Sequence, residues 1–359
     1  MSASFEIASS TGAYQVQIEP HAFKDYLRRF TNPAIIADKF FAPVLHSIDL
    51  PAILVDATEA NKSLDASPRL IEQLRKSGAT RETELVAVGG GIVQDLASFI
   101  ASVYMRGLRW SYIPTTVLAM VDSCIGGKSS INVGPYKNLV GTFHPPTRVL
   151  IDPSLAQTLP DEQKTGGLIE AAKICFCRGS ESFDRYLYCG PSTSMSTEAL
   201  DAVIISSLES KKWFIEIDEF DKSERLLLNF GHTFGHAIEG ASRFAVPHGI
   251  AVGLGILCAL SFERGNGANY ARAPIVQALE DHLQQMLASV PELAERLHAM
   301  PLNDFMESFA SDKKHGAGYY TLVLVAEDGR VVLRKITRSV GVDDALRDAV
   351  QATIDRFAR

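Results

Sequence analysis

The chain has 359 residues, of which 46% are hydrophobic and 21% are charged, and its formal net charge is -7 at pH 7. This composition is typical of a globular protein, and the lack of a basic run argues against a nucleic-acid partner. No apolar run is long enough to span a bilayer and the N-terminus lacks a signal-peptide pattern, so we expect no membrane partner. Five cysteines without a paired framework favour the reducing cytoplasm.

Short β-rich runs alternate with helical patterns in the first part of the chain, as they do in βαβ units. Strands are predicted at residues 14–18, 34–37, 52–55, 84–88 and 110–113, and helices at residues 70–76 and 94–105. Beyond residue 160, helices are predicted at residues 162–175, 197–218, 231–244, 249–264 and 275–287, with one hairpin at residues 319–325 and 330–335. We therefore predict an α/β domain over residues 1–158 and a mostly α-helical domain over residues 159–359.

Three glycines, Gly89, Gly90 and Gly91, lie between the strand predicted at residues 84–88 and the following helix. Strand, glycine turn and helix is the order of a phosphate-binding crossover, in which backbone amides approach a pyrophosphate. The turn lacks the GxGxxG fingerprint, so a purely structural role stays open. Asp95, one turn into the helix, could cap it or bind a ligand.

A second glycine-containing loop, residues 121–129, resembles a Walker A loop only superficially, because Asp122 occupies the position of its opening glycine. The loop still offers a carboxylate at Asp122 and an ammonium at Lys128. Lys137 and Asn138 follow in a segment that we predict to be long and irregular, as functional loops often are. Its apolar content argues against disorder.

Two histidines, His232 and His236, lie one turn apart on the same face of a predicted helix, and Asn229 precedes them. His248 follows this helix and Glu170 lies upstream of it. One carboxylate and two or three imidazoles can form a zinc site that leaves a position open for a substrate. A histidine pair on a helix is also common as a structural or solvated feature, so the neighbouring residues decide between the two interpretations.

Several cations accompany the histidines and the glycine loops. Lys173 shares a helix face with Glu170, and Arg225 lies one turn before Asn229. Judged singly, each lysine is a solvated surface charge; judged together, the cations indicate a local basic site for a small anion. The set is Arg106, Lys128, Lys173, Lys211, Arg225, Lys313 and Lys314.

In this combination the chain resembles the dehydroquinate synthases and their relatives, the sugar phosphate cyclases, over residues 59–314. The motifs that carry the resemblance occur in the family's order: Gly-Gly-Gly-Ile-Val-Gln-Asp95, Tyr104-Met-Arg-Gly107, Ile113-Pro-Thr-Thr116, Val121-Asp-Ser-Cys-Ile-Gly-Gly-Lys128, Lys137-Asn138, Glu170 with Lys173, and residues 229–236. The resemblance implies an N-terminal NAD-binding α/β domain, a C-terminal helical domain, and a divalent metal, zinc or cobalt, in the cleft between them.

The resemblance also implies roles for individual residues. The implied metal ligands are Glu170, His232 and His248. The implied NAD contacts are Glu59, Lys62, Gly89, Gly90, Gly91, Asp95, Thr115, Thr116, Asp122, Ser123 and Lys137. Substrate binding falls to Arg106, Lys128, Asn138, Arg225, Lys313 and Lys314, with Arg106 reaching from the partner subunit of a homodimer. Catalytic roles fall to Lys173, Lys211, Asn229, His236 and Asp122. From spacing alone, Glu59 and Lys62 are surface charges.

The implied reaction is that of a lyase of the shikimate pathway for aromatic amino acids. It converts 3-deoxy-D-arabino-heptulosonate 7-phosphate into 3-dehydroquinate and phosphate by transient NAD oxidation, phosphate elimination, reduction and intramolecular aldol closure. Arg225 and Lys128 favour a carboxylated substrate, because a neutral one would leave their charges uncompensated. Gln94, Thr58 and Ile250 stand where the family usually has glycine, glycine and glutamate. A cyclase of secondary metabolism, such as an aminodehydroquinate synthase, is therefore an alternative, followed by a metal-dependent alcohol dehydrogenase.

Overall fold

The computed structural model describes residues 3–134 and 136–357, which form two compact units. Unit 1 comprises Met1–Leu159 and Met195–Phe220, and unit 2 comprises Pro160–Ser194 and Asp221–Arg359. The predicted boundary between residues 158 and 159 lies one residue before the point where unit 1 first gives way to unit 2. The sequence analysis did not predict that residues 195–220 return to unit 1. The predicted domain limits include residues 1–2 and 358–359, which lie outside the described residues, and they stay a prediction.

Unit 1 is built on a seven-stranded sheet with the order β1-β2-β9-β6-β5-β3-β4. Only β1 and β2 are antiparallel; the other neighbours are parallel. The strands are β1 (Ala3–Ile7), β2 (Tyr14–Ile18), β3 (Ala34–Asp38), β4 (Ala52–Val55), β5 (Leu85–Gly89), β6 (Trp110–Pro114) and β9 (Arg148–Ile151). The helices are α1 (Phe23–Arg28), α2 (Ala42–Ser47), α3 (Ser67–Lys76), α4 (Gly91–Val103) and α7 (Thr197–Ile217).

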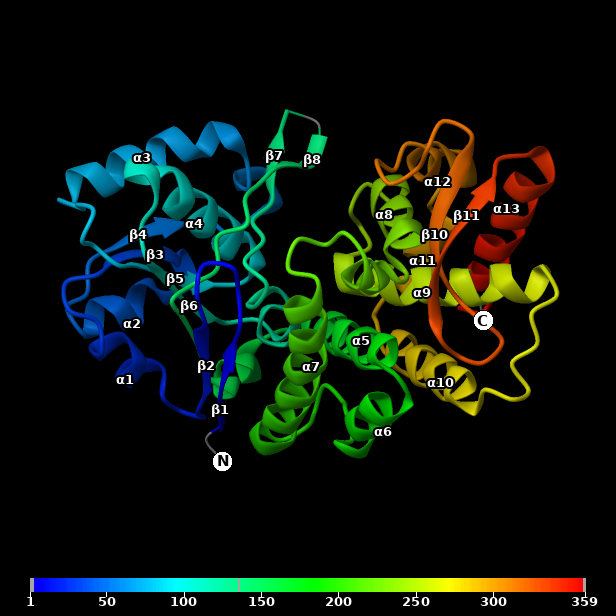
Figure 1. Cartoon of the computed structure of the whole chain (residues 1–359), viewed down its shortest axis with the longest axis horizontal. Helices are drawn as coiled ribbons and strands as arrows, with labels where there is room; N and C mark the ends of the chain where they lie inside the picture. Colours follow the sequence, from blue (N-terminus) through cyan, green and yellow to red (C-terminus); the bar gives the residue numbers. More distant parts are fainter. Residues whose placement is uncertain (1–2, 135, 358–359) are drawn as a thin grey trace. The chain divides into compact units, whose positions relative to one another are not determined.

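Helices cover both faces of this sheet, which explains why its central strands are apolar runs without alternation. Ile35 of β3 and Val86 and Val88 of β5 pack with residues of α1 and α2 in one buried cluster. The helices α3 and α4 lie on the opposite face (Figure 1). This doubly covered parallel sheet confirms the predicted α/β class of the N-terminal part.

The connection between β4 and β5 creates a topological switch point in the sheet. The chain runs from β3 outward to the edge strand β4 and then returns to the other side of β3 to form β5. In open parallel sheets such a reversal leaves a crevice at the carboxyl ends of the two diverging strands, where ligands bind. These ends are Asp38 of β3 and Gly89 of β5, so the fold places the glycine turn at the crevice.

The segment predicted to be irregular is so only in part: residues 141–147 form no helix or strand beyond an isolated bridge at Phe143, but the prediction was wrong for the residues before them. It contains a hairpin of β7 (Ile131–Val133) and β8 (Tyr136–Val140), in which Ile131 pairs with Val140 and Val133 with Tyr136. On β7 the apolar Ile131 and Val133 alternate with Asn132, which favours a strand, and Gly134 adopts a positive φ of 55°. Pro135 lies outside the described residues.

Unit 2 is mostly helical, as predicted, and its helices surround α9. Nearly all residues of α9 from Gly249 to Phe262 are buried, since α5, α8, α10 and α13 pack against it. Its helices are α5 (Asp161–Arg178), α6 (Ser180–Tyr188), α8 (His232–Ala241), α9 (His248–Gly265), α10 (Pro274–Ala288), α11 (Leu293–His298), α12 (Leu302–Ala310) and α13 (Val340–Asp355). The antiparallel strands β10 (Tyr319–Val325) and β11 (Val331–Thr337) form the predicted hairpin. Within the described residues, no helix has the length and apolarity needed to cross a membrane.

Candidate functional site

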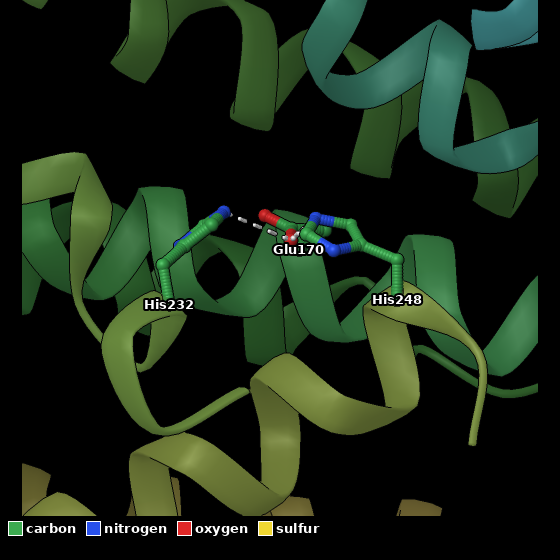
Figure 2. A group of neighbouring side chains, drawn as sticks. All are labelled: Glu170, His232 and His248. Carbon is green, nitrogen blue, oxygen red and sulfur yellow. Dashed lines mark ion pairs between the residues drawn. The ribbon is translucent and has the colours of Figure 1, made fainter. Parts of the chain in front are cut away.

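Three side chains from three helices of unit 2 converge on one point. Glu170 of α5, His232 of α8 and His248 of α9 point toward one another in Figure 2. The Nε2 atom of His232 lies 3.8 Å from Oε1 of Glu170, and the Nε2 atom of His248 lies 3.5 Å from the same oxygen. One donor atom from each residue lies within 4.8 Å of the other two. Three such donors suit a divalent cation with positions left open for a substrate.

The carboxylate of Glu170 provides an independent reason to expect a cation. Its side chain is fully buried, and neither oxygen accepts a hydrogen bond of regular geometry from the described residues. The buried Nζ atom of Lys173 lies 2.5 Å from Oε2. The two groups form an ion pair whose angles are not those of a regular hydrogen bond. A buried carboxylate that lacks hydrogen bonds is unfavourable unless another group compensates it. The donor set therefore fits a bound divalent metal.

A close contact between two glycines sets the spacing of two of these donors. Gly166 of α5 lies one turn before Glu170, and Gly249 of α9 directly follows His248. A Cβ atom added to Gly249 would lie 2.4 Å from the carbonyl oxygen of Gly166 and 2.5 Å from its Cα atom. The two backbones approach this closely only because both residues lack a side chain.

Gly249→Ala is therefore expected to force α5 and α9 apart. We expect overpacking to lower the free energy of unfolding by about 1–3 kcal/mol and the shifted helices to weaken metal binding. Chemical denaturation of the metal-free protein and a metal titration measure the two effects. Gly265→Ala is the matched control, because its added Cβ meets nothing within 4 Å near the end of the same helix. Equal behaviour of the two variants contradicts the prediction.

The pKa values of the three histidines of this region are shifted in different directions. Burial, followed by the charge of Lys173, holds the pKa of His232 well below its ordinary value, so this imidazole is neutral and able to ligate a metal. Burial also lowers the pKa of His248, but the hydrogen bond and charge of Glu239 outweigh it and the pKa is raised. Burial lowers the pKa of His236 despite the nearby Asp312.

His236 is paired with an acidic residue next to the predicted lysines. Its Nδ1 atom lies 3.9 Å from Oδ2 of Asp312, and the same oxygen lies 2.9 Å from Nζ of Lys314. These two contacts offset the burial of Asp312 and hold the pKa of its carboxyl well below the ordinary range. The structure thus brings His236 and Lys314 together through Asp312, which the sequence analysis missed. Lys313 is exposed.

Arg225 and Asn229 lie on a short 3-10 helix, Glu224–Asn229, that precedes α8 and contacts α5. The Arg225 side chain is only 3% exposed. The Nδ2 atom of Asn229 donates a hydrogen bond to the Leu226 carbonyl at 3.0 Å. A buried guanidinium beside the helix of His232 and His236 suits the binding of an anionic group.

In unit 1, the glycine turn has the geometry of a phosphate-binding crossover. A Cβ atom on Gly89 would lie 2.6 Å from Cγ2 of Val93, and one on Gly90 would lie 2.9 Å from Cγ2 of Thr116. Gly90 precedes α4 without a side-chain cap, so the first amides of this helix are open to an anion. The amide of Thr115 donates to the Gly89 carbonyl at 3.0 Å, which joins the predicted Thr115 and Thr116 to the turn.

Asp38 is a candidate that the sequence analysis missed. It ends β3, the neighbour of β5, at the switch point of the sheet. An acidic residue at this position is suited to bind ribose hydroxyls of a dinucleotide. The sequence alone could have indicated Asp38, because an apolar run that predicts a strand ends directly at this aspartate.

Lys62 is buried, which corrects the expectation of a surface charge. Its Nζ atom donates to Oδ2 of Asp95 at 3.1 Å and to Oδ1 of Asn138 at 2.8 Å, and lies 3.8 Å from Oε1 of Glu59. The same Glu59 oxygen lies 3.6 Å from Nζ of Lys137. Five predicted ligand-binding residues therefore form one charged network. Asn138 adopts a positive φ of 53°, a strained conformation that is often found at functional sites.

We expect Asp95 to make the stability of unit 1 dependent on pH. Burial raises the pKa of its carboxyl from 3.8 to about 6, against the opposing effects of Lys62 and the Ser130 amide. The protonated form is thus favoured by folding, so the stability that it contributes is present below about pH 4 and is lost as the pH rises through 6.

Asp95→Asn is expected to remove this dependence. Relative to the variant, the parent should lose about 1–3 kcal/mol of unfolding free energy between about pH 4 and pH 7. Urea denaturation at both pH values measures the difference, with Asp65→Asn, an exposed residue of the same unit, as the control. A parent-minus-variant difference that stays constant with pH contradicts the prediction.

Asp122 and Ser123, predicted to lie in a loop, end a short π-helix, Ala119–Ser123, which Lys211 and Gln94 anchor together with the loop that follows it. The Nζ atom of Lys211 lies 2.6 Å from Oδ1 of Asp122 and donates to the carbonyl oxygens of Asp122 and Ile125. Gln94 donates to the Ser123 carbonyl at 2.6 Å and accepts from its hydroxyl at 2.5 Å. In this structure Lys211 thus binds the loop within unit 1. Lys128 lies in the same loop region, with its Nζ atom 5.9 Å from the ring centre of Phe143.

Arg106 is exposed on a strained turn that follows α4. Met105 and Arg106 both adopt positive φ values, 48° and 70°, and Gly107 follows at 123°. Consecutive left-handed residues other than glycine are unfavourable and occur mainly where function requires them. The Tyr104 hydroxyl holds the turn by donating to the Ala79 carbonyl at 2.9 Å.

A glycine turn at a sheet switch point and a separate helical unit with a carboxylate and two imidazoles define a nucleotide- and metal-dependent enzyme class. Family models described as 3-dehydroquinate synthase N-terminal and C-terminal match residues 52–165 and 167–315. The 3-dehydroquinate synthase of Dictyoglomus turgidum is 36% identical over 317 residues, which cover 86% of each chain. The chain belongs to the 3-dehydroquinate synthase family.

Proteins with other names are also similar to this chain, in sequence or in fold. The 2-deoxy-scyllo-inosose synthase of Streptomyces kanamyceticus is 34% identical over 84% of this chain and 76% of its own length. A solved 2-deoxy-scyllo-inosose synthase complexed with carbaglucose-6-phosphate, NAD+ and Co2+ has a TM-score of 0.82 at 22% identity, covering 96% of this chain and 100% of its own. An iron-containing alcohol dehydrogenase from Thermococcus thioreducens has a TM-score of 0.66 at 15% identity, covering 95% and 98%. These two structures share the fold.

Proposed function

We propose that this chain is a 3-dehydroquinate synthase, which converts 3-deoxy-D-arabino-heptulosonate 7-phosphate into 3-dehydroquinate and phosphate. Membership of the family supports the proposal. The observation that carries it is the fully buried Glu170 carboxylate, which faces two imidazoles and an ammonium and lies in the same unit as the buried Arg225. These groups offer a metal site and a partner for a substrate carboxylate.

We propose NAD as the cofactor, at the carboxyl end of β5, and zinc or cobalt at Glu170, His232 and His248. Solved relatives with NAD+ and Co2+, or with NAD+ and Zn2+, support both proposals. When bound, the dinucleotide accepts and returns a hydride, and the cation lowers the pKa of the substrate hydroxyl that loses it. The buried carboxylate of Glu170, which both imidazoles approach, fits the cation, and the first turn of α4, which no side chain caps, fits the dinucleotide.

The side chains of unit 2 would do the remaining work. Arg225 would hold the substrate carboxylate through two parallel hydrogen bonds. Lys173 and His236 would stabilise the charge that grows on the leaving phosphate, while the substrate's own phosphate takes the proton from the neighbouring C-H group. Asn229 would orient hydroxyls. In unit 1, Lys128, Asn138 and Lys211 keep their predicted roles in substrate binding and catalysis.

Metal dependence provides the direct test. Purified protein incubated with the heptulosonate phosphate, NAD and zinc should release phosphate and form dehydroquinate. Treatment with a chelator should abolish phosphate release, because Glu170, His232 and His248 then lack the cation that they share, and added zinc or cobalt should restore it. Full activity after complete removal of the metal would contradict the proposal.

A cyclase that acts on a neutral sugar phosphate is the second candidate, since a 2-deoxy-scyllo-inosose synthase is 34% identical. The planar guanidinium of Arg225, which suits a carboxylate, favours a carboxylated substrate over a neutral one. Phosphate release measured with the heptulosonate phosphate, its amino analogue and glucose 6-phosphate separates the cyclases. An alcohol dehydrogenase, in contrast, would accumulate NADH with turnover, whereas a cyclase shows no net change.

We further propose a cytoplasmic homodimer. The strained turn that exposes Arg106 supports a role for this residue toward a second subunit. Among the described residues no two cysteines form a disulfide, in keeping with a reducing compartment.

A further inference from the structure

The two imidazoles of the metal site are each held by an oxygen on the side away from Glu170. The Nδ1 atom of His232 lies 3.4 Å from the Phe230 carbonyl. The Nδ1 atom of His248 lies 3.0 Å from Oε2 of Glu239. Glu239 belongs to α8, three residues after His236, and its side chain is 13% exposed. The support of His248 is thus a carboxylate from a neighbouring helix.

The contact with Glu239 fixes which nitrogen of His248 can bind a cation. An ionised carboxylate only accepts hydrogen bonds, so Nδ1 carries the proton that it receives. The lone pair of the neutral ring is then on Nε2, the atom that lies 3.5 Å from Oε1 of Glu170. A ring held in this tautomer needs no rotation or proton transfer before it binds a metal.

We propose that Glu239 is a positioning residue that holds His248 in its ligating tautomer and orientation, and thereby sets the affinity of the site for a divalent cation. A carboxylate behind a ligating imidazole raises its basicity as well as fixing its direction. The inference rests on the proposed function only in that Glu170, His232 and His248 bind a metal.

The support of His248 comes from α8 and not from its own helix. Ile250, which stands where the resembled family usually has glutamate, is fully buried and offers no acceptor. Glu239 supports His248 from outside α9. His236, Glu239 and His248 also lie close enough to form a second donor cluster. We favour the positioning role because the 3.0 Å contact already engages the Nδ1 atom that a second metal would need.

The test measures metal affinity without substrate or NAD. Zinc affinity is determined by competition with a chromophoric chelator, and stoichiometry by elemental analysis, for the parent, Glu239→Ala, Glu239→Gln and Glu307→Gln. Glu239→Ala should weaken zinc binding about 10- to 100-fold. Glu239→Gln should weaken it less, because its amide oxygen still accepts the hydrogen bond. Glu307→Gln, an exposed position on α12, should match the parent.

Three outcomes would overturn the inference. If the folded Glu239→Ala protein binds zinc as tightly as the parent, even with lower thermal stability, Glu239 has only a structural role. Two zinc ions in the parent and one in Glu239→Ala make Glu239 a ligand of a second site. If the parent binds no zinc, the proposed metal site itself is wrong. This outcome distinguishes failure of the proposed function from failure of the inference about Glu239 alone.

Discussion

Glu170→Gln is expected to lower kcat/KM by about 10³-fold or more, which corresponds to about 4 kcal/mol of lost transition-state stabilisation. The substitution keeps the shape of the side chain but removes the negative charge from the point where His232 and His248 converge. A neutral amide is a weak ligand for zinc or cobalt, so tight metal binding should be lost together with activity.

Calorimetric zinc titration and steady-state kinetics measure the two losses in the same preparations. Glu181→Gln, an exposed position on α6 of the same unit, serves as the matched control and should behave like the parent. If Glu170→Gln binds zinc as tightly as the parent, Glu170 is not a metal ligand.

Arg225→Gln is expected to lower kcat/KM for a carboxylated substrate by about 10²- to 10⁴-fold, since it removes two charge-assisted hydrogen bonds of about 1.5–3 kcal/mol each. Arg225→Lys keeps the charge but not the planar fork, so its loss should be smaller. Zinc affinity should change little in either variant, because the guanidinium is not among the three donors that converge at the metal site.

Kinetics with carboxylated and neutral sugar phosphates check this prediction. Arg272→Gln, which alters an exposed arginine of the same unit, controls for the general loss of one positive charge. If Arg225→Gln lost activity equally toward both kinds of substrate, the assignment of Arg225 to a substrate carboxylate would be wrong.

The main elements of the fold could be predicted because their patterns are local. Short apolar runs followed by an aspartate predicted β3 and β4, and runs followed by a glycine and by a proline predicted β5 and β6. Helical spacing predicted α5, α7 and α9. The short helices α1 and α2 were missed, since six-residue helices carry little periodic signal and owe their stability to packing. The four-residue strand β9 was also missed, because its position is fixed by pairing with β2 and β6 and not by a local pattern.

The candidate site was only partly predictable, because motif order indicates which residues gather and not what each one contacts. Lys211 looked like a solvated charge until its partner Asp122, which lies 89 residues away in sequence, was placed beside it. Likewise, the hydrogen bonds between Gln94 and Ser123 join positions 29 residues apart. The roles of individual residues stay predictions until the variants are measured.

The return of α7 to unit 1 has a consequence for synthesis on the ribosome. Residues 1–159 can form the sheet, but α7 packs against the element Ala119–Ser123, and Lys211, which anchors the Asp122 loop, is made later. Residues 160–194, which belong to unit 2, emerge before it. The units therefore cannot mature strictly one after the other, as domains of a growing chain generally do. A nascent chain holds an unfinished first unit until residue 220 has left the exit tunnel.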